Sequence, residues 1–228
     1  INFCVSFSQP VIITLNICMA GQYFVDKVLN TTVQKDPWQH QIVQDSLPKA
    51  MFSRLQQQCE QFLHTDVQRN MGDVRSDRMY IFPDQFRDHG IDLYDELRDV
   101  ATVILHNAQQ LTQGLYTDPR WYDSLTVYAH IAIVPPRPAT AFTIHEEAMD
   151  KIWSSVTYVA PEVNVGTKMY TAPDESAFVS EAEWRPNNSF IFCGQKGVTW
   201  HKFQSDQHSN RISLNLFLMS DKRKKYFV

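Results

Sequence analysis

Cysteine is scarce in this sequence, and its spacing argues against two common ways of stabilising a chain. The four cysteines are Cys4, Cys18, Cys59 and Cys193, and no two of them form a Cys-x-x-Cys pair. A disulfide framework or a structural zinc site is therefore not expected, since each needs thiols at characteristic spacings. The pattern is typical of a reducing compartment, so we expect a cytoplasmic location.

Motifs of several other protein classes are also missing. The chain has no Gly-x-Ser-x-Gly elbow, no glycine-rich phosphate loop and no His-Glu-x-x-His pair, which argues against a hydrolase. The formal net charge is -4, so the general attraction to nucleic acid is missing and no such partner is expected. Residues 1–18 are apolar but include Pro10 and fall short of the roughly 20 residues that a membrane helix needs, so no membrane partner is expected.

What is present fits one folded unit. The chain has 228 residues, of which 43% are hydrophobic and 20% charged, enough to bury a core. We expect a single domain over residues 19–228. We interpret residues 1–18, which lack a basic residue and precede Met19, as a non-native or disordered extension. The oligomeric state is not indicated.

Two helices are predicted in the first half. Asp45 and Ser46 are expected to cap a helix whose apolar residues recur at helical spacing up to about residue 63. A second helix is expected from its cap at Asp92 to about residue 113, before Gly114. The polar residues 64–91 between them are predicted to be loop and short strand at the edge of a pocket. This stretch contains Arg69, Arg75, Arg78 and Arg87.

In the second half the apolar pattern changes to a period of two. Strands are predicted near residues 125–134, 140–147, 151–160, 166–171, 188–193, 198–204 and 210–219, with a short one at 38–44. Many short strands in succession favour an all-β sandwich or jelly roll. We therefore expect helical support from about residue 45 to 113, packed on the outside of a core from about residue 120 to 220.

The last predicted strand has two chemically different faces. Ile212, Leu214, Leu216 and Leu218 alternate with Arg211, Ser213, Asn215 and Phe217. Because neighbouring residues of a strand point to opposite faces, one face suits a core and the other a polar pocket inside a barrel.

Three side chains in this region form a candidate metal site. His145 and Glu147 lie two apart after a strand-like segment, so their side chains point to the same face, and His201 lies in another strand-like run. Two imidazoles and one carboxylate are the ligands that hold non-haem Fe(II) on one side and leave its other positions open. Arg211, ten residues after His201, could bind an acidic co-substrate through two parallel hydrogen bonds.

With these residues in place, the stretch from about Leu125 to Leu218 resembles the 2-oxoglutarate- and Fe(II)-dependent oxygenases. The likeness is greatest to the prolyl-4-hydroxylase-like branch and its short bacterial and phage members. The resemblance implies a mainly β, α+β fold with a double-stranded β-helix (jelly-roll) core and flanking helices. It also implies a dioxygenase that uses Fe(II), 2-oxoglutarate and O2 to hydroxylate a C–H bond, with succinate and CO2 as co-products.

The resemblance assigns roles to six residues. His145, Glu147 and His201 would ligate iron, Arg211 would pair with the distal carboxylate of 2-oxoglutarate, and Ser213 would add a hydroxyl. Tyr158 would be a further co-substrate-binding residue, and no catalytic residue is implied beyond the metal ligands.

The chain departs from the family pattern at three places. Glu147 stands where most members have Asp, and Val134-Pro135-Pro136 stands where many hydroxylases have a Tyr. The glycine-rich strand that often follows is represented only by Val165-Gly166-Thr167.

The sequence leaves the substrate open among a protein side chain, an amino acid and a small metabolite. Trp153, Trp184, Trp200 and Phe217 could line the pocket, although aromatic core packing explains them equally well. Arg137 and Lys151 could contact an anionic substrate or be surface charges.

Two other functions remain open. A cupin-like metalloenzyme would use the same three ligands without 2-oxoglutarate, and it would have no need of Arg211. A non-enzymatic jelly-roll binding module would use neither iron nor the His and Glu side chains.

Overall fold

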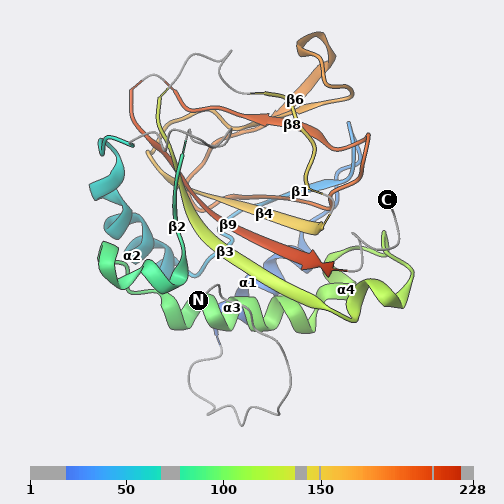
Figure 1. Ribbon diagram of the computed structural model, residues 1–228, viewed down its shortest axis with the longest axis horizontal. Coiled ribbons are helices and arrows are strands. Elements are labelled where there is room, and N and C mark those ends of the chain that lie inside the picture. Colours follow the sequence, from blue (N-terminus) through green and yellow to red (C-terminus); the bar gives the residue numbers. More distant parts are fainter. Residues whose placement is uncertain (1–18, 68–77, 137–142, 149, 207, 222–228) are drawn as a thin grey trace.

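The computed structural model describes residues 19–67, 78–136, 143–148, 150–206 and 208–221 (Figure 1). The helices are α1 (Ala20–Asn30), α2 (Lys49–Cys59), α3 (Tyr94–His106) and α4 (Ala108–Leu111). The strands are β1 (His40–Val43), β2 (Met79–Ile81), β3 (Leu125–Val134), β4 (Lys151–Ala160), β5 (Thr167–Tyr170), β6 (Phe178–Ala182), β7 (Ser189–Phe192), β8 (Trp200–Phe203) and β9 (Arg211–Ser220). Short 3-10 turns are Glu60–Phe62, Pro83–Gln85, Arg87–His89, Pro119–Tyr122 and Glu175–Ala177.

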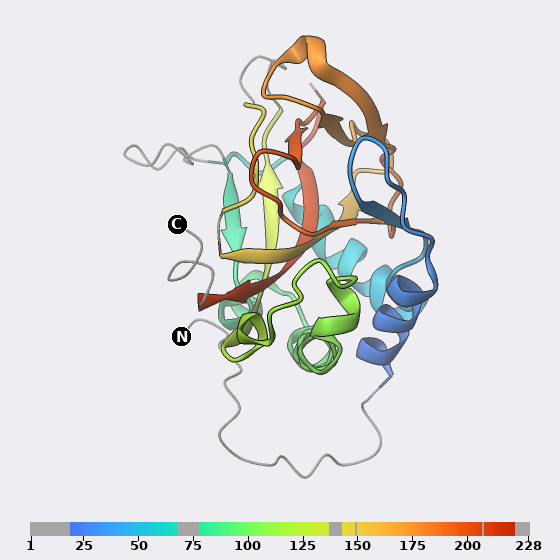
Figure 2. The same cartoon turned by 90° about the vertical axis from the view of Figure 1, so that its right-hand side faces the viewer.

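The strands form two antiparallel sheets. The larger sheet has the order β1-β7-β4-β9-β3-β2, and the smaller one has the order β6-β5-β8. The helices cover one face of the large sheet, and the small sheet lies over its other face (Figures 1 and 2). This arrangement confirms the predicted α+β fold with a jelly-roll core and flanking helices.

Strand β9 lies between β4 and β3 in the large sheet, and β3 and β9 form the longest pairing in it. They pair over ten residues, from Leu125 opposite Ser220 to Val134 opposite Arg211. The predicted two-faced character of β9 is confirmed, because Leu214, Leu216 and the other leucine-side residues are fully buried in the core beneath the helices. Apolar burial of this extent is the main term that holds the helices to the sheet.

Two predicted strands coincide with β3 and β4, but one predicted strand is wrong and one strand of the structure was not predicted. Residues 143–147 of the predicted 140–147 strand form only an isolated bridge between His145 and His201, and residues 140–142 lie outside the described part. The physical reason is that the chain leaves the ladder after one residue, as Glu147 turns toward Lys151 and Ser154. Strand β6 was not expected, because its solvent-facing residues give it little apolar alternation.

Neither predicted helix cap is correct. Helix α2 begins after Pro48 and α3 after Leu93, each without a side-chain cap. Asp45 adopts a left-handed conformation with φ of 49°, and the Ser46 hydroxyl donates to the Asn187 carbonyl oxygen at 3.1 Å. The loop before β7 thus takes the group that would otherwise have capped the helix, a tertiary contact that local sequence does not show.

The second predicted helix is interrupted at Asn107. Its side-chain amide donates to the Val103 carbonyl oxygen at 2.8 Å, and α4 follows as a separate short helix. Gly114 adopts φ of 71° beyond it, which suits the predicted end of the helical region.

Helix α1 was not predicted, although it belongs to the core. Phe24 is fully buried, and its ring meets that of Trp153 edge to face at 6.3 Å between centroids. Trp153 therefore packs in the core and not in a pocket. Among the helices that the structure describes, none combines the length and apolar character needed to cross a bilayer.

Some predictions fall on residues that are not described. The interpretation of residues 1–18 and the roles suggested for Arg69, Arg75 and Arg137 lie outside the described residues.

We predict that Phe24→Ala lowers the free energy of unfolding by about 3–5 kcal/mol, because it removes a fully buried ring and leaves a cavity against Trp153. Leu29→Ala is the matched control on the same helix, since Leu29 is 41% exposed and its loss should cost less than about 0.5 kcal/mol. Chemical denaturation measures both. Equal effects would show that α1 is not packed as described.

Candidate functional site

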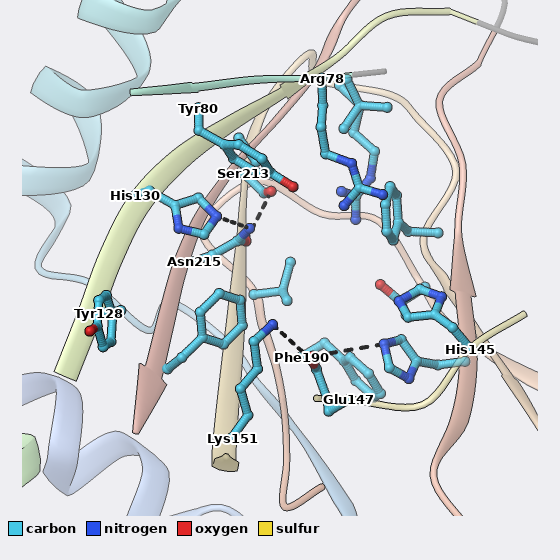
Figure 3. A pocket seen from close by; sticks show the side chains of 18 of the residues that line it. Arg78, Tyr80, Tyr128, His130, His145, Glu147, Lys151, Phe190, Ser213 and Asn215 are labelled. Carbon is cyan, nitrogen blue, oxygen red and sulfur yellow. Dashed lines mark hydrogen bonds and ion pairs between the residues drawn. The ribbon is translucent and has the colours of Figure 1, made fainter. Parts of the chain in front are cut away.

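A cavity of about 290 Å³ lies between the two sheets (Figure 3). Five of the six predicted site residues line it, namely His145, Glu147, His201, Arg211 and Ser213. The fold therefore brings together side chains that lie up to 68 positions apart in the sequence, from His145 to Ser213. They come from both sheets and from a connecting segment.

The strand alternation explains which side chains reach the cavity. On β9, Arg211, Ser213, Asn215 and Phe217 line it, while the residues between them enter the core. On β3, His130 lies opposite Asn215 and faces the same space. These polar side chains avoid the cost of burial in an apolar environment because they point into the cavity and not into the core.

The backbones of His145 and His201 are paired, and the Nε2 atom of each ring points away from its own backbone. His145 and His201 exchange both backbone hydrogen bonds at 2.9 Å, and their rings lie 4.4 Å apart between centroids. Each Nδ1 faces a backbone carbonyl oxygen, that of Thr143 at 3.0 Å and that of Thr199 at 2.9 Å. A carbonyl can only accept, so Nδ1 carries the proton and Nε2 keeps its lone pair, as a metal ligand requires.

Both imidazoles are neutral at ordinary pH. Burial lowers the pKa of His201 to about 4, and His145 beside it acts in the same direction. Burial also lowers the pKa of His145. Neutral rings with free Nε2 atoms are competent to bind a divalent cation without first losing a proton.

The Glu147 carboxylate lies between the histidines and Lys151. Its Oε1 is 3.9 Å from His201 Nε2 and accepts from the Ser154 hydroxyl at 3.3 Å, while its Oε2 accepts from Lys151 Nζ at 2.8 Å. Burial alone would raise the pKa of Glu147, but Lys151 and, less strongly, the histidines outweigh it and the pKa is lowered. The group is therefore an ionised, buried carboxylate.

In the described part of the chain, no three His, Cys, Asp or Glu side chains are gathered tightly enough to form a complete metal-ligand set. Ligand atoms that share a cation at about 2.1 Å lie roughly 3 Å apart, which is closer than the 3.9 Å between Glu147 and His201. The donor types and the free Nε2 atoms fit a divalent cation, and the carboxylate would have to move toward them from its place beside Lys151.

Arg211 is a buried guanidinium that has no acidic partner among the described residues. Its side chain is 2% exposed, and its Nε and Nη2 make no hydrogen bond within that part of the chain. It lies over the rings of Tyr158, Trp184 and Phe203 at 5.4, 4.9 and 5.4 Å. Burial lowers its pKa to about 10, with Tyr158 opposing the shift and Arg78 adding to it, so it remains charged at neutral pH. A buried cation with unused donors is a site for an anion.

Tyr158 lies behind Arg211 and does not line the cavity. Its hydroxyl donates to the Ala182 carbonyl oxygen at 3.2 Å and lies 3.0 Å from Thr167 Oγ1, and its ring stacks on Trp184 at 4.5 Å. Burial raises its pKa, so the hydroxyl stays protonated. These contacts suit a residue that supports the Arg211 side chain, and direct binding of a co-substrate by Tyr158 stays a prediction.

A glycine brings the small sheet close to this support. A Cβ on Gly166 would lie only 1.9 Å from the Ala182 carbonyl oxygen. The Gly166 N–H donates to Glu181 Oε1 at 2.7 Å. Close packing of the small sheet thus requires a glycine in the segment Val165-Gly166-Thr167.

A chain of hydrogen bonds along one wall of the cavity was not predicted from the sequence. The Ser213 hydroxyl donates to Asn215 Oδ1 at 3.1 Å, which turns the amide Nδ2 toward His130 Nε2 at 3.1 Å (Figure 3). Since Nε2 accepts, the proton of the neutral ring is on Nδ1. The alternation within residues 125–134, which puts Tyr128 and His130 on one face, was the available signal.

The other suggested pocket residues divide between the cavity and the core. Phe217 lines the cavity, and Lys151 Nζ lies 3.7 Å from its ring centre. Trp184 lies behind Arg211, and Trp200 is not among the lining residues. Arg78, from the stretch predicted to edge a pocket, does line it, whereas Arg87 is exposed outside it.

Comparison with known proteins finds likeness in structure and not in sequence. No protein-family model and no curated protein sequence matches the chain. A prolyl hydroxylase from Trichoplax adhaerens, solved with a hypoxia inducible factor peptide, is 12% identical with a TM-score of 0.54, over 91% of this chain and 92% of that one. A Pseudomonas putida prolyl-4-hydroxylase is 18% identical with a TM-score of 0.53, over 89% and 99%.

A third solved structure comes from a plant. Dioxygenase for auxin oxidation 1 from Arabidopsis thaliana, solved with 2-oxoglutarate, is 13% identical with a TM-score of 0.54, over 86% of this chain and 87% of that one. At these identities the comparisons establish a shared fold. The predicted likeness to prolyl 4-hydroxylases and 2-oxoglutarate dioxygenases is thereby confirmed at the level of architecture.

We predict that His130 makes the protein less stable as the pH falls. Burial, aided by Lys151 and Arg78, lowers the pKa of His130 to about 3, below its unfolded value of about 6.5. Between about pH 3 and pH 6.5, His130 binds a proton in the unfolded chain but stays neutral in the folded protein. Stability should therefore fall from about pH 6.5 to about pH 4.5, by on the order of 2 kcal/mol from this group.

The measurement is urea denaturation across that pH range, with His130→Gln for comparison. The variant should lose less stability than the wild type on acidification. Parallel curves for the two proteins would show that His130 is not a buried neutral imidazole.

Proposed function

We propose that the protein is an Fe(II)- and 2-oxoglutarate-dependent dioxygenase that hydroxylates a C–H bond of its substrate, with succinate and CO2 as co-products. The observation that carries the proposal is Arg211, a buried guanidinium with unused donors in the same cavity as His145, Glu147 and His201. The shared fold with prolyl hydroxylases and a 2-oxoglutarate-bound dioxygenase supports it.

The electrostatics of Arg211 favour a dicarboxylate. A buried guanidinium without a counter-ion bears a desolvation cost that an incoming carboxylate would offset through two charge-assisted hydrogen bonds. The Ser213 hydroxyl lies two residues along the same face and lines the same cavity. We infer that Arg211 binds the distal carboxylate of 2-oxoglutarate and that Tyr158 and Trp184 hold the guanidinium in place from behind.

The histidines and Glu147 would hold the metal. The tautomers fixed by Thr143 and Thr199 leave both Nε2 atoms available, and a cation would draw Glu147 Oε1 toward them. The second oxygen can keep its bond to Lys151, which would orient the carboxylate. Fe(II) so bound would supply oxidative decarboxylation of 2-oxoglutarate coupled to hydroxylation.

The remaining walls would keep the reaction away from bulk water. Phe190, Phe192 and Phe203 line the cavity beside the histidines, and the first two are almost fully buried. An apolar enclosure of this kind strengthens charge interactions inside it and limits side reactions.

Two observations favour a different function. The Lys151–Glu147 ion pair and the absence of a complete ligand set among the described residues would suit a metal-free binding module that takes an organic anion on Arg211. A cupin-like enzyme is less well supported, because it has no use for Arg211.

We predict that Fe(II) followed by 2-oxoglutarate, added without oxygen, gives a weak visible charge-transfer band that needs both additions. His201→Ala should abolish it by removing a metal ligand. Arg211→Gln should bind iron normally but need at least about 30-fold more 2-oxoglutarate, because losing one partner of a buried pair costs at least about 2 kcal/mol. His64→Ala, which removes an exposed imidazole, is the matched control and should behave as wild type.

Absorption titration of the four proteins decides among the functions. Iron binding without any dependence on 2-oxoglutarate would favour the cupin-like enzyme. A protein that binds no iron, yet binds dicarboxylates through Arg211, would be the binding module. An unchanged 2-oxoglutarate requirement in Arg211→Gln would refute the role of Arg211.

A further inference from the structure

The cavity lining has an excess of positive charge. Arg78, Lys151 and Arg211 line it against one described carboxylate, Glu147. Under the proposed function, a divalent cation and a dicarboxylate cancel each other's charge. The loaded cavity would thus keep its cationic excess, which favours a substrate that is itself an anion.

Arg78 is the cation left to meet such a substrate. It precedes β2, whose register with β3 continues from Met79 opposite Ile133, so Arg78 and Arg211 flank Val134 on neighbouring strands. Its guanidinium lies 4.4 Å from the Phe203 ring centre and makes no ion pair within the described residues. Arg78 points into the cavity from the edge strand of the sheet (Figure 3).

The two arginines differ in depth. Arg211 is 2% exposed, whereas Arg78 is only half-buried. A ligand entering from the β2 edge therefore meets Arg78 before Arg211. Figure 3 shows Arg78 at the rim of the space between His130 and His145, which lie on opposite sides of the cavity.

An aromatic wall continues from Arg78 along the same side. Tyr80 and Phe82 follow it at two-residue intervals, and their rings lie 4.7 and 5.7 Å from that of His130. On the other side of His130, the ring of Phe217 extends this wall, with 5.5 Å between the two ring centroids. All four rings line the cavity, so an apolar or flat group would find contact next to the guanidinium.

We propose that the primary substrate is a carboxylic acid with an apolar or aromatic body. Arg78 binds its carboxylate, and Tyr80, Phe82 and Phe217 contact the body. This inference rests on the proposed function, because it assigns Arg211 to the co-substrate and leaves Arg78 for the substrate.

The test compares acids with their uncharged amides. Calorimetric titrations of benzoate, 3-phenylpropionate and hexanoate, each beside its primary amide, are made into the full chain loaded with Ni(II) and 2-oxoglutarate. At least one acid should bind about tenfold more tightly than its amide, as expected for a hydrogen bond to a charged group at a partly exposed site. Arg78→Gln should reduce the preference to within about twofold of unity.

Arg87→Gln is the matched control, because it removes the same charge from an exposed position outside the cavity. It should keep the full preference for the acid. Arg78→Lys, which retains the charge but not the planar fork, should keep part of it. Unchanged thermal midpoints of the variants show that they are folded.

Several outcomes would overturn the proposal. They are equal binding of acids and amides, no binding of any of the three acids, and a preference that survives in Arg78→Gln. A loss of 2-oxoglutarate affinity in Arg78→Gln as large as that in Arg211→Gln would also overturn it, since Arg78 would then be a co-substrate ligand. If the wild type cannot be loaded at all, the proposed function fails, and the same titrations on the unloaded protein decide whether Arg78 selects acids.

Discussion

The ten-residue pairing of β3 with β9 is the constraint on which the rest of the molecule depends. One face of this ribbon buries Leu214 and Leu216 against the helices, and the other carries Arg211, Asn215 and His130 into the cavity. The register of this pairing therefore determines both which side chains enter the core and which side chains line the cavity. Because side chains alternate along a strand, core and cavity cannot shift independently of each other.

The polar groups of the cavity are satisfied to different degrees. Glu147 accepts hydrogen bonds from Lys151 and Ser154, and His130 accepts one from Asn215, so these groups find their hydrogen-bond partners within the protein. Arg211 differs from them, because two of its buried nitrogens are unused among the described residues. A stable protein tolerates few such groups, and each calls for a partner such as a water, an ion or a ligand. The contrast points to an anion at Arg211 more directly than to a cation at Glu147.

Much of the architecture could be read from the sequence, and the reasons are local. The alternation in residues 125–134 and 211–218 reflects burial on one face, so β3, β9 and the cavity side of Arg211 and Ser213 could be predicted. The helix starts could not, because Ser46 bonds to Asn187, which is 141 residues away.

The site shows the same division between local and distant causes. The spacing of His145, Glu147 and His201 indicated a shared cavity, but the Glu147–Lys151 pair and the support of Arg211 by Trp184 depend on side-chain directions that spacing does not encode. Gly166 shows how far such dependence extends. With no side chain, it allows the Ala182 carbonyl to approach, and that carbonyl accepts from the Tyr158 hydroxyl beneath Arg211. The orientation of the buried Arg211 guanidinium thus depends on the absence of even a single methyl group at residue 166, which takes no part in the chemistry itself.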